Sequence, residues 1–287
     1  MTAPAELVMG AVAYDPKVVT IWNGFRRWLR DKGLGFDFVL YSNYERQVED
    51  LVAGRIDAAW NSPLAWVRAQ RLARARGGAV RALVMRDTDQ DLVSVVVVDS
   101  RAPFQSVADL AGATVATGAV DSPQGTLLPL DALRQQGLVP GQDFKVRRFD
   151  VGVGLHGDHV GGERDAVRAL VAGEVDAACL LDANHLVFAQ EGLLVPGGTR
   201  VIATTPLFDH CNMTVTDGAD PSLVSQFEAL LLAMDYGDAA VRPLLDLEGL
   251  TKWVDGRLDG YGPLERAVDA TGFYGRGGSI TAAGYAP

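Results

Sequence analysis

The sequence predicts an α/β fold made of two lobes, each built around its own sheet. Short runs rich in β-branched residues alternate with longer segments whose apolar residues recur every three or four positions. This alternation is typical of strand–helix–strand units around parallel strands. The pattern restarts over residues 95–117, as if a second sheet began there. A length of 287 residues with 48% hydrophobic content is enough for one large domain or two modest ones.

Extended and helical segments follow one another along the chain. The expected strands are the runs LVMGAVAY, FDFVLYS, IDAAWNS, LVSVVVV, ATVATGA, FKVRRFDV, VDAACLL and RVIATTP. The expected helices between them include YERQVEDLVAG, SPLAWVRAQRLARAR, GTLLPLDALRQQG and RDAVRALVAGE. The longest apolar run, LVSVVVVDS, turns polar after about seven positions, so it is predicted as a buried strand. The later run TTPLFDHCNMTVTDG is expected to be extended and to lead into helices that continue to the end.

From the two expected sheets we predict two Rossmann-like lobes. Two crossover strands, near Asp99 and near Phe208, are expected to join them. Residues 1–98 and 209–287 are therefore expected to form one lobe, and residues 99–208 the other. In open α/β sheets, ligands bind beyond the carboxyl ends of the strands. A ligand is accordingly expected in a cleft between the lobes.

Charge and cysteine content exclude several classes of function. A net charge of −10 argues against non-specific binding to nucleic acid, which needs a basic surface. Cys179 and Cys211 are too few for a disulfide scaffold, and their spacing matches no zinc motif. The sequence shows no export signal and no apolar run long enough for a membrane span, so as written it is expected to be cytoplasmic. An export signal ahead of it would make the protein periplasmic or extracellular.

Polar side chains gather where the expected strands end. All four histidines of the chain lie in such places, and two of them fall in the stretch GLHGDHVGGERDAV at residues 154–167. The polar residues at the strand ends are Tyr14, Asn61, Ser62, Ser122, Gln124, Thr126, His156, Asp158, His159, Glu163, Asp182, His185, His210 and Cys211. Because the carboxyl ends of parallel strands meet at one edge of a sheet, these side chains are candidates for a ligand site.

Several longer phrases carry a family resemblance over nearly the whole chain. They are YSNYERQVEDLVAGRIDAAWNSPLAWVRA, LVSVVVVDSRAPFQSVADLAGATVATG, SPQGTLLPLDAL, DAVRALVAGEVDAACLLDANHL and GYGPLERAVDATGF. The chain resembles the phosphonate/phosphate-type substrate-binding proteins of ABC importers, which have the type II periplasmic binding protein fold. The resemblance implies a solute-binding protein that presents its ligand to an ABC permease and needs no cofactor.

The resemblance also implies how the ligand is held. A small anionic or zwitterionic ligand, phosphonate-like, phosphate-like or derived from an amino acid, would be bound by hydroxyl groups and backbone N–H groups at helix N-termini. The matching positions are Tyr14, Asn61, Ser62, Ser122, Gln124, Gly125 and Thr126. Asp182 matches an acidic residue that can pair with an amine on the ligand.

Two departures from the family pattern bear on the ligand. The family's run of three small hydroxyl residues is here SPQGT, which predicts a weaker or differently shaped phosphonate cradle. The family's short Gly-Ser-His-Asp turn is replaced by the longer HGDHVGGERD, and Glu163 stands near the place of the expected histidine. A carboxylate at that place repels a phosphonate dianion.

Each candidate also has a purely structural interpretation. Ser62 and Ser122 each precede a proline and can be ordinary helix caps that contact only their own helix. Tyr14 can belong to the core with its hydroxyl in water. Asp182 can cap the helix ANHLVFAQEG and do nothing else.

The histidines leave a second function open. His156, His159, His210 and Cys211 could together hold a divalent metal, with a carboxylate such as Asp158 or Glu163 completing the site. Such a site would favour the alternative function, a cytosolic biosynthetic enzyme on the same fold that acts on a small anionic substrate. No metal motif such as HExxH is present, so we interpret the stretch 154–167 as a loop that contacts the ligand through His156 or His159, with His210 as a further contact.

Overall fold

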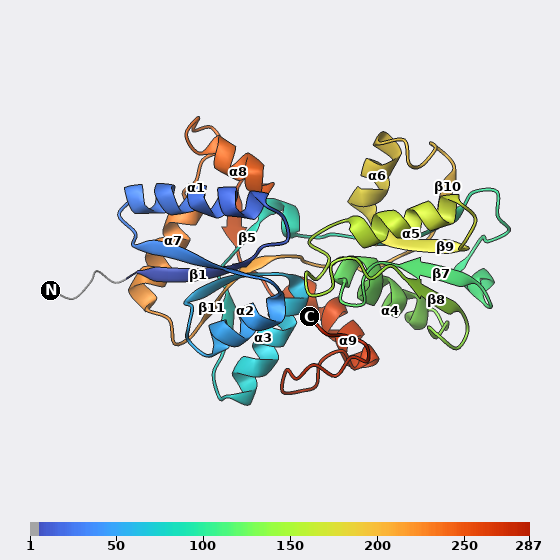
Figure 1. The fold of residues 1–287 in the computed structure, drawn as a ribbon, viewed down its shortest axis with the longest axis horizontal. Helices are drawn as coiled ribbons and strands as arrows, with labels where there is room; N and C mark the ends of the chain where they lie inside the picture. Colours follow the sequence, from blue (N-terminus) through green and yellow to red (C-terminus); the bar gives the residue numbers. More distant parts are fainter. Residues whose placement is uncertain (1–5) are drawn as a thin grey trace. The chain divides into compact units, whose positions relative to one another are not determined.

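The structure, a computed structural model, describes residues 6–287 and divides into two compact units (Figure 1). The first unit comprises the described residues up to Gln90, together with Asp209–Tyr261 and Tyr274–Ile280. The second unit comprises Asp91–Phe208, Gly262–Phe273 and Thr281–Pro287. This division differs from the expected lobes in two places, because residues 91–98 belong to the second unit and the C-terminal segment contributes to both.

The first unit is built on a five-stranded sheet in the order β2-β1-β3-β11-β4. Its strands are β1 (Leu7–Val12), β2 (Phe36–Tyr41), β3 (Ala58–Asn61), β4 (Val80–Ala82) and β11 (Asn212–Thr216). β1 runs parallel to β2 and β3, whereas β11 runs antiparallel to β3 and β4. A separate antiparallel pair joins β5 (Val84–Arg86) to β12 (Trp253–Asp255). The sequence predicted parallel sheets, and this part of the expectation was wrong because the returning strand β11 enters in the opposite direction.

Helices cover both faces of this sheet. They are α1 (Lys17–Asp31), α2 (Tyr44–Val52), α3 (Pro63–Ala75), α7 (Pro221–Leu232) and α8 (Arg242–Glu248). Figure 1 shows α1 on one side of β1, and α2 and α3 on the other. Successive side chains of a strand point to opposite faces, and accordingly Leu7, Met9 and Ala11 enter the core under α1 while Val8 packs with Leu51 of α2.

The second unit is built on a five-stranded sheet in the order β10-β6-β9-β7-β8. Its strands are β6 (Ser94–Asp99), β7 (Thr114–Thr117), β8 (Lys145–Arg148), β9 (Ala177–Leu181) and β10 (Thr199–Thr204). β7 runs parallel to β8 and β9, and β6 runs antiparallel to β9 and β10. The carboxyl ends of β7, β8 and β9 therefore lie at one edge of the sheet.

Both faces of the second sheet are also covered. Its helices are α4 (Leu128–Gln135), α5 (Gly161–Val171), α6 (Asp182–Gln190) and α9 (Gly262–Thr271). Within β6, Val95 and Val97 pack into the core under α5, and Val96 and Val98 pack into the opposite core with Leu133 of α4. A strand buried on both faces explains why its sequence is apolar without alternation. Among the helices of residues 6–287, none has the length and hydropathy that a membrane span requires.

Candidate functional site

The carboxyl edge of the second sheet brings together the starts of three helices. A π-helical turn, Pro123–Leu127, follows β7 and continues into α4. The helix α5 begins at Gly161, after the loop that follows β8, and α6 begins directly after β9. A helix N-terminus carries a partial positive charge and free N–H groups, so this edge favours a negatively charged group.

Ser122 shapes the turn that starts α4. Its hydroxyl Oγ accepts a hydrogen bond from the Gly125 N–H at 3.0 Å, and Pro123 occupies the first position of the turn, where no N–H donor is needed. The Leu127 N–H donates to the Ser122 carbonyl at 3.0 Å, which closes a π-type ring. The cap predicted at Ser122 is confirmed, and its hydroxyl has the Gly125 N–H as a partner within the protein.

Two side chains of this turn offer polar atoms for which residues 6–287 supply no partner. Gln124 and Thr126 are each 3% exposed. The Gln124 amide Nε2 donates to the Gly157 carbonyl at 2.8 Å. Gln124 Oε1 and Thr126 Oγ1, however, have no hydrogen-bond partner within residues 6–287. A buried polar atom without a partner costs free energy, so these two atoms are well suited to contact a ligand.

Glu163, in the first turn of α5, places a buried carboxylate at the same edge. It is 2% exposed, and its Oε2 accepts from the Leu181 N–H at 2.9 Å and from Asn184 Nδ2 at 2.8 Å. The carboxylate thus links the start of α5 to the start of α6. A Cβ atom at Gly125 would lie 3.0 Å from Glu163 Cγ, so glycine at position 125 permits this close approach. Burial and the charge of Glu163 both raise the pKa of the nearby Cys179 thiol, which keeps it neutral.

The loop between β8 and α5 is fastened by a second buried carboxylate. Asp121 Oδ2 accepts from the Gly154 N–H at 2.6 Å and from the His156 N–H at 3.3 Å. Burial raises the pKa of Asp121, although the His156 ring and the N–H donors oppose that shift. His156 is fully buried with a positive φ of 51°, and its Nε2 lies 3.2 Å from the Tyr285 hydroxyl. His156 therefore anchors the loop to the C-terminal segment of the second unit.

A small cavity of about 10 Å³ lies among these groups. It is lined by Gly118, Ala119, Ser122, Val151, Gly157, His159, Gly162 and Glu163. Its volume is about that needed for one water molecule or one ligand oxygen atom. His159 Nδ1 accepts from the Gly161 N–H at 3.2 Å, so in the neutral ring the proton is assigned to Nε2. His159 Nε2 has no partner in the described part of the chain and can donate to a ligand.

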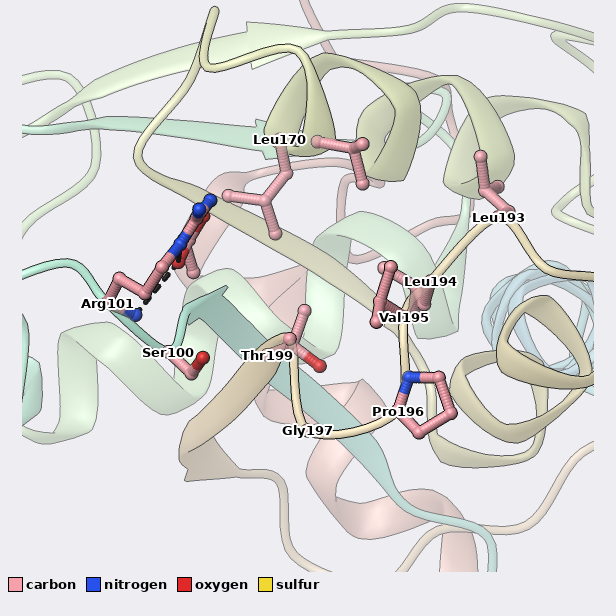
Figure 2. A pocket seen from close by; sticks show the side chains of 12 residues that line it. Ser100, Arg101, Leu170, Leu193, Leu194, Val195, Pro196, Gly197 and Thr199 are labelled. Atoms are coloured by element: carbon pink, nitrogen blue, oxygen red, sulfur yellow. Dashed lines mark hydrogen bonds and ion pairs between the residues drawn. The ribbon is translucent and has the colours of Figure 1, made fainter.

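The second unit has two larger cavities, which differ from the small one in their lining residues. One of about 560 Å³ is lined by Thr126 and by largely apolar residues of α4, β8 and the C-terminal segment. Two of its lining residues, Arg148 and Asp150, form an ion pair. The other, of about 390 Å³, lies at the end of β6, on the sheet edge away from the carboxyl ends of β7 and β9. Figure 2 shows its apolar lining and the Arg101 guanidinium, which is already paired with Asp99.

In the first unit, the predicted ligand residues follow β1 and β3. Tyr14 is half-buried and packs against the core, and the Ser62 hydroxyl accepts from the Ala65 N–H at 3.1 Å as the cap of α3. Asn61 is fully buried, and its amide Nδ2 donates to Thr214 Oγ1 at 2.8 Å while its Oδ1 accepts from Gln47 at 2.9 Å. These bonds give Asn61 a structural role between β3 and β11; ligand contact by Tyr14, Asn61 and Ser62 stays a prediction.

The predicted metal ligands are distributed over both units. His156 and His159 belong to the second unit, and His210 and Cys211 to the first. Within residues 6–287, the three side chains whose ligating atoms lie within 4.8 Å of one another are Asp89, His210 and Cys211. His210 Nδ1 lies 3.1 Å from Cys211 Sγ and 3.5 Å from Asp89 Oδ1.

Arg86 determines the chemistry of that cluster. Its guanidinium binds both carboxylate oxygens of Asp89, at 2.6 and 2.8 Å. Burial acts to raise the pKa of Asp89, but Arg86 and the His210 hydrogen bond outweigh burial and hold this pKa at about 2. The carboxylate is thus ionised and already paired, which weakens the case for a metal at Asp89, His210 and Cys211.

Asp182 and His185 lie on α6. Asp182 is exposed at the first position of the helix, and no side chain caps this helix at Leu181. Within the second unit the Asp182 carboxylate therefore has no cost of desolvation to offset, and its pairing with a ligand amine stays a prediction. His185 Nε2 contacts Thr199 Oγ1 at 2.9 Å, which ties α6 to β10.

Sequence reasoning placed Asp121 at a strand end but gave it no role, and it gave none to Asn184. Each of them fastens a group at the small cavity, since Asp121 holds the loop and Asn184 binds the Glu163 carboxylate. The acidic residue directly before the Ser-Pro cap was a usable signal for Asp121. For Asn184 there was none, because its partner lies 21 positions away in sequence.

Comparisons with known proteins relate this geometry to binding proteins. Residues 10–261 match the family model described as ABC transporter, phosphonate, periplasmic substrate-binding protein. The structure is similar to PhnD1 of Prochlorococcus marinus in complex with methylphosphonate, with a TM-score of 0.68 and 17% identity over 93% of this chain and 98% of that one. It is also similar to a Xanthomonas citri protein solved with chloride bound, with a TM-score of 0.69 and 19% identity over 92% and 97%.

A third similar structure is a sulfonate-binding protein. The periplasmic aliphatic sulphonate binding protein SsuA of Escherichia coli has a TM-score of 0.53 and 18% identity over 93% of this chain and 87% of that one. At these identities the structural matches establish the fold alone, and they confirm the predicted type II periplasmic binding protein architecture. The enzyme alternative finds no support in these matches. Substrate-binding proteins of this kind generally need no cofactor.

Proposed function

We propose, because this chain belongs to the family of periplasmic substrate-binding proteins of phosphonate ABC transporters, that it captures a small molecule with a phosphonate, phosphate or sulfonate group. Its partner is then the permease of an ABC importer, and it binds its ligand in the periplasm. The similar structures with methylphosphonate and from a sulfonate-binding protein support this range of anionic groups.

The observation that carries the proposal is the polar lining of the carboxyl edge of the second sheet. There the helix starts favour negative charge, and Gln124 Oε1, Thr126 Oγ1 and His159 Nε2 lack partners within the described residues. Thr126 and His159 can each donate a hydrogen bond to an anionic oxygen. The small cavity beside Ser122 has room for one such oxygen.

A panel of anions tests this proposal by isothermal titration calorimetry. Methylphosphonate, inorganic phosphate and methanesulfonate are titrated into wild-type protein, into Thr126→Val and into the double variant Ser122→Ala/Thr126→Ala. We expect at least one anion to bind, and the double variant to lose about 1–3 kcal/mol of binding free energy through two lost hydrogen bonds.

Thr126→Val is the sharper variant. Because Thr126 Oγ1 has no partner in the described part of the chain, replacing the hydroxyl with a methyl group should leave thermal stability unchanged or raised while it weakens binding. Ser106→Ala serves as a control, since Ser106 also caps a short helix of the second unit but lies on an exposed segment. Unchanged affinity in both site variants would place the anion elsewhere.

A further inference from the structure

We propose that the cavity of about 560 Å³ beside α4 holds the organic part of the ligand, so that the protein prefers anions with an apolar substituent of several carbon atoms. This inference rests on the proposed function and names a class of ligand within it. The cavity is lined by α4, by the segment between β7 and α4, by β8 and the residues after it, and by the C-terminal segment. All these residues belong to the second unit. We call this cavity the α4 pocket.

The α4 pocket has the size and the lining of a site for an apolar group. Ligand pockets commonly measure about 300–1,000 Å³ and are lined mostly by apolar side chains with a few polar groups. Here the apolar lining includes Leu127, Leu130, Val146 and Phe273. Leu127 and Phe273 are 3% and 2% exposed, so these walls are part of the packed structure. A methyl group would leave most of this volume unfilled, whereas a longer substituent would displace water from the apolar walls.

The charged side chains at the pocket are paired with each other. Arg148 Nε lies 3.3 Å from Asp150 Oδ2, and the two side chains are 40% and 39% exposed. Asp150 Oδ1 also accepts from the Val120 N–H at 2.8 Å. The Thr271 hydroxyl donates to the Ala267 carbonyl at 2.8 Å. Because the charges of Arg148 and Asp150 offset each other, the pocket suits a part of the ligand that carries no charge.

Thr126 connects this pocket to the proposed anion site. It lines the pocket and is 3% exposed, and its Oγ1 has no hydrogen-bond partner among residues 6–287. An anionic oxygen that accepts from this hydroxyl lies about 2.7 Å from it, and therefore at the wall of the pocket. The small cavity is lined by Ala119 and Ser122, and the α4 pocket by Val120 and Thr126. The Thr126 N–H donates to the Ser122 carbonyl at 3.1 Å, so the two linings share one turn.

The C-terminal wall of the α4 pocket is held in place by backbone hydrogen bonds. The N–H groups of Thr281 and Ala282 donate to the Phe273 carbonyl at 3.1 and 3.2 Å. The Phe273 ring packs on the Tyr285 ring, with centroids 4.9 Å apart. Ala282 and Ala283 line the pocket with small side chains, which leaves its volume open. These residues follow position 261, where the family match ends, so the pocket depends on residues that the match does not cover.

A series of substituents tests the inference by isothermal titration calorimetry. The probes are methyl-, propyl- and hexylphosphonate and the three matching sulfonates. Each methylene group that becomes buried contributes about fourfold in affinity. We therefore expect the hexyl member of at least one series to bind at least about tenfold more tightly than the methyl member, with the propyl member between them. The heat capacity change of binding should become more negative along the series, because more apolar surface is buried.

Ala283→Trp should remove this preference, because its indole ring would occupy the pocket. Ala283 is exposed, so the substitution adds bulk without replacing a core side chain. The ratio of hexyl to methyl affinity should fall toward one. Ala286→Trp is the matched control, since it adds the same side chain to an exposed position of the same segment that does not line the pocket. Its ratio should equal that of the wild type.

The possible failures are distinguishable. Wild-type protein that binds none of the six probes would overturn the proposed function and this inference with it. Equal affinity for methyl and hexyl members would refute the inference alone. So would hexylphosphonate that binds without displacing methylphosphonate, because the substituent would then occupy a separate site. A hexyl preference that persists in Ala283→Trp would place the substituent outside the α4 pocket. If that variant does not fold, Ala282→Leu, which also adds bulk to the lining, decides the question by the same ratio.

Discussion

Asp89 is a carboxylate that the fold buries almost completely and pairs with the Arg86 guanidinium. Burial acts against ionisation, yet Arg86 and His210 hold the pKa of Asp89 at about 2, below its ordinary value of 3.8. A carboxyl group whose pKa is depressed by folding stabilises the protein above its unfolded pKa, and this stabilisation disappears as pH falls toward the folded pKa. The relevant window is therefore pH 4 to 2.

Asp89→Asn should separate this effect from general acid unfolding. At pH 7 the variant should lose about 3 kcal/mol of unfolding free energy, because the buried Arg86 guanidinium loses its bidentate carboxylate partner and keeps only the Glu248 carboxylate, at 3.4 Å. Between pH 4 and 2 the wild type should lose about 2 kcal/mol more than the variant does. Urea unfolding at pH 7, 4, 3 and 2 measures both. Asp165→Asn, at an exposed pair with Arg168, is the control; equal pH slopes for wild type and Asp89→Asn would contradict the argument.

At the scale of elements, the start of α5 depends on close backbone packing. A Cβ at Gly162 would lie 2.6 Å from the Phe149 carbonyl oxygen and 3.1 Å from Gly118 Cα, and backbone atoms cannot move aside as a flexible side chain can. This approach is what brings Glu163 against the turn at Ser122. Gly162→Ala should lower the free energy of unfolding by about 1–3 kcal/mol, as overpacking does.

The control for this variant is Gly262→Ala at the start of α9. There a Cβ would meet nothing closer than Arg266 Nη1 at 3.8 Å. Alanine is the better helix former, so this variant should be neutral or slightly stabilised. Chemical denaturation of both variants checks the pair. Equal effects would show that close packing is not what requires glycine at position 162.

At the scale of the whole molecule, the C-terminal residues complete both units. In the second unit, α9 buries Leu264, Ala267 and Val268, and the Tyr285 ring packs on Phe273 with centroids 4.9 Å apart. In the first unit, the Tyr274 hydroxyl donates to Glu45 at 2.6 Å. The family match ends at residue 261, yet the residues after it belong to the folded core.

A chain that ends at residue 261 should therefore not fold cooperatively. Burial of each large apolar side chain contributes about 1.5–3 kcal/mol, so the loss of several approaches the whole stability of a domain. Circular dichroism melting and size-exclusion chromatography measure the outcome. A chain that ends at Tyr285 lacks only the exposed Ala286 and Pro287 and should melt like the full chain. A normal melting curve for the shorter chain would refute the assignment of its last residues to the cores.

Several features of this protein are determined by residues that are close together in the sequence. The strand runs and the helices between them follow from periodicities of two and about 3.6 residues, which depend only on neighbouring positions. The caps at Ser62 and Ser122 are local for the same reason, and both are confirmed. The two-sheet α/β architecture follows from the order of these elements.

Tertiary structure decided what depends on distant partners. Three features depend on how apolar faces pack into the two cores, which periodicity does not encode. They are the direction of β6 and β11, the unit to which α9 belongs, and the short strands β4, β5 and β12, which local patterns did not predict. Ligand contact by Asn61 stays a prediction, and local sequence did not predict the bond from its amide to Thr214, 153 positions away. Glu163 was recognised as a departure from the family pattern, and only packing could place its carboxylate against Gly125 and Asn184. Contacts of this kind depend on sheet packing over long sequence separations, which no short stretch of sequence specifies.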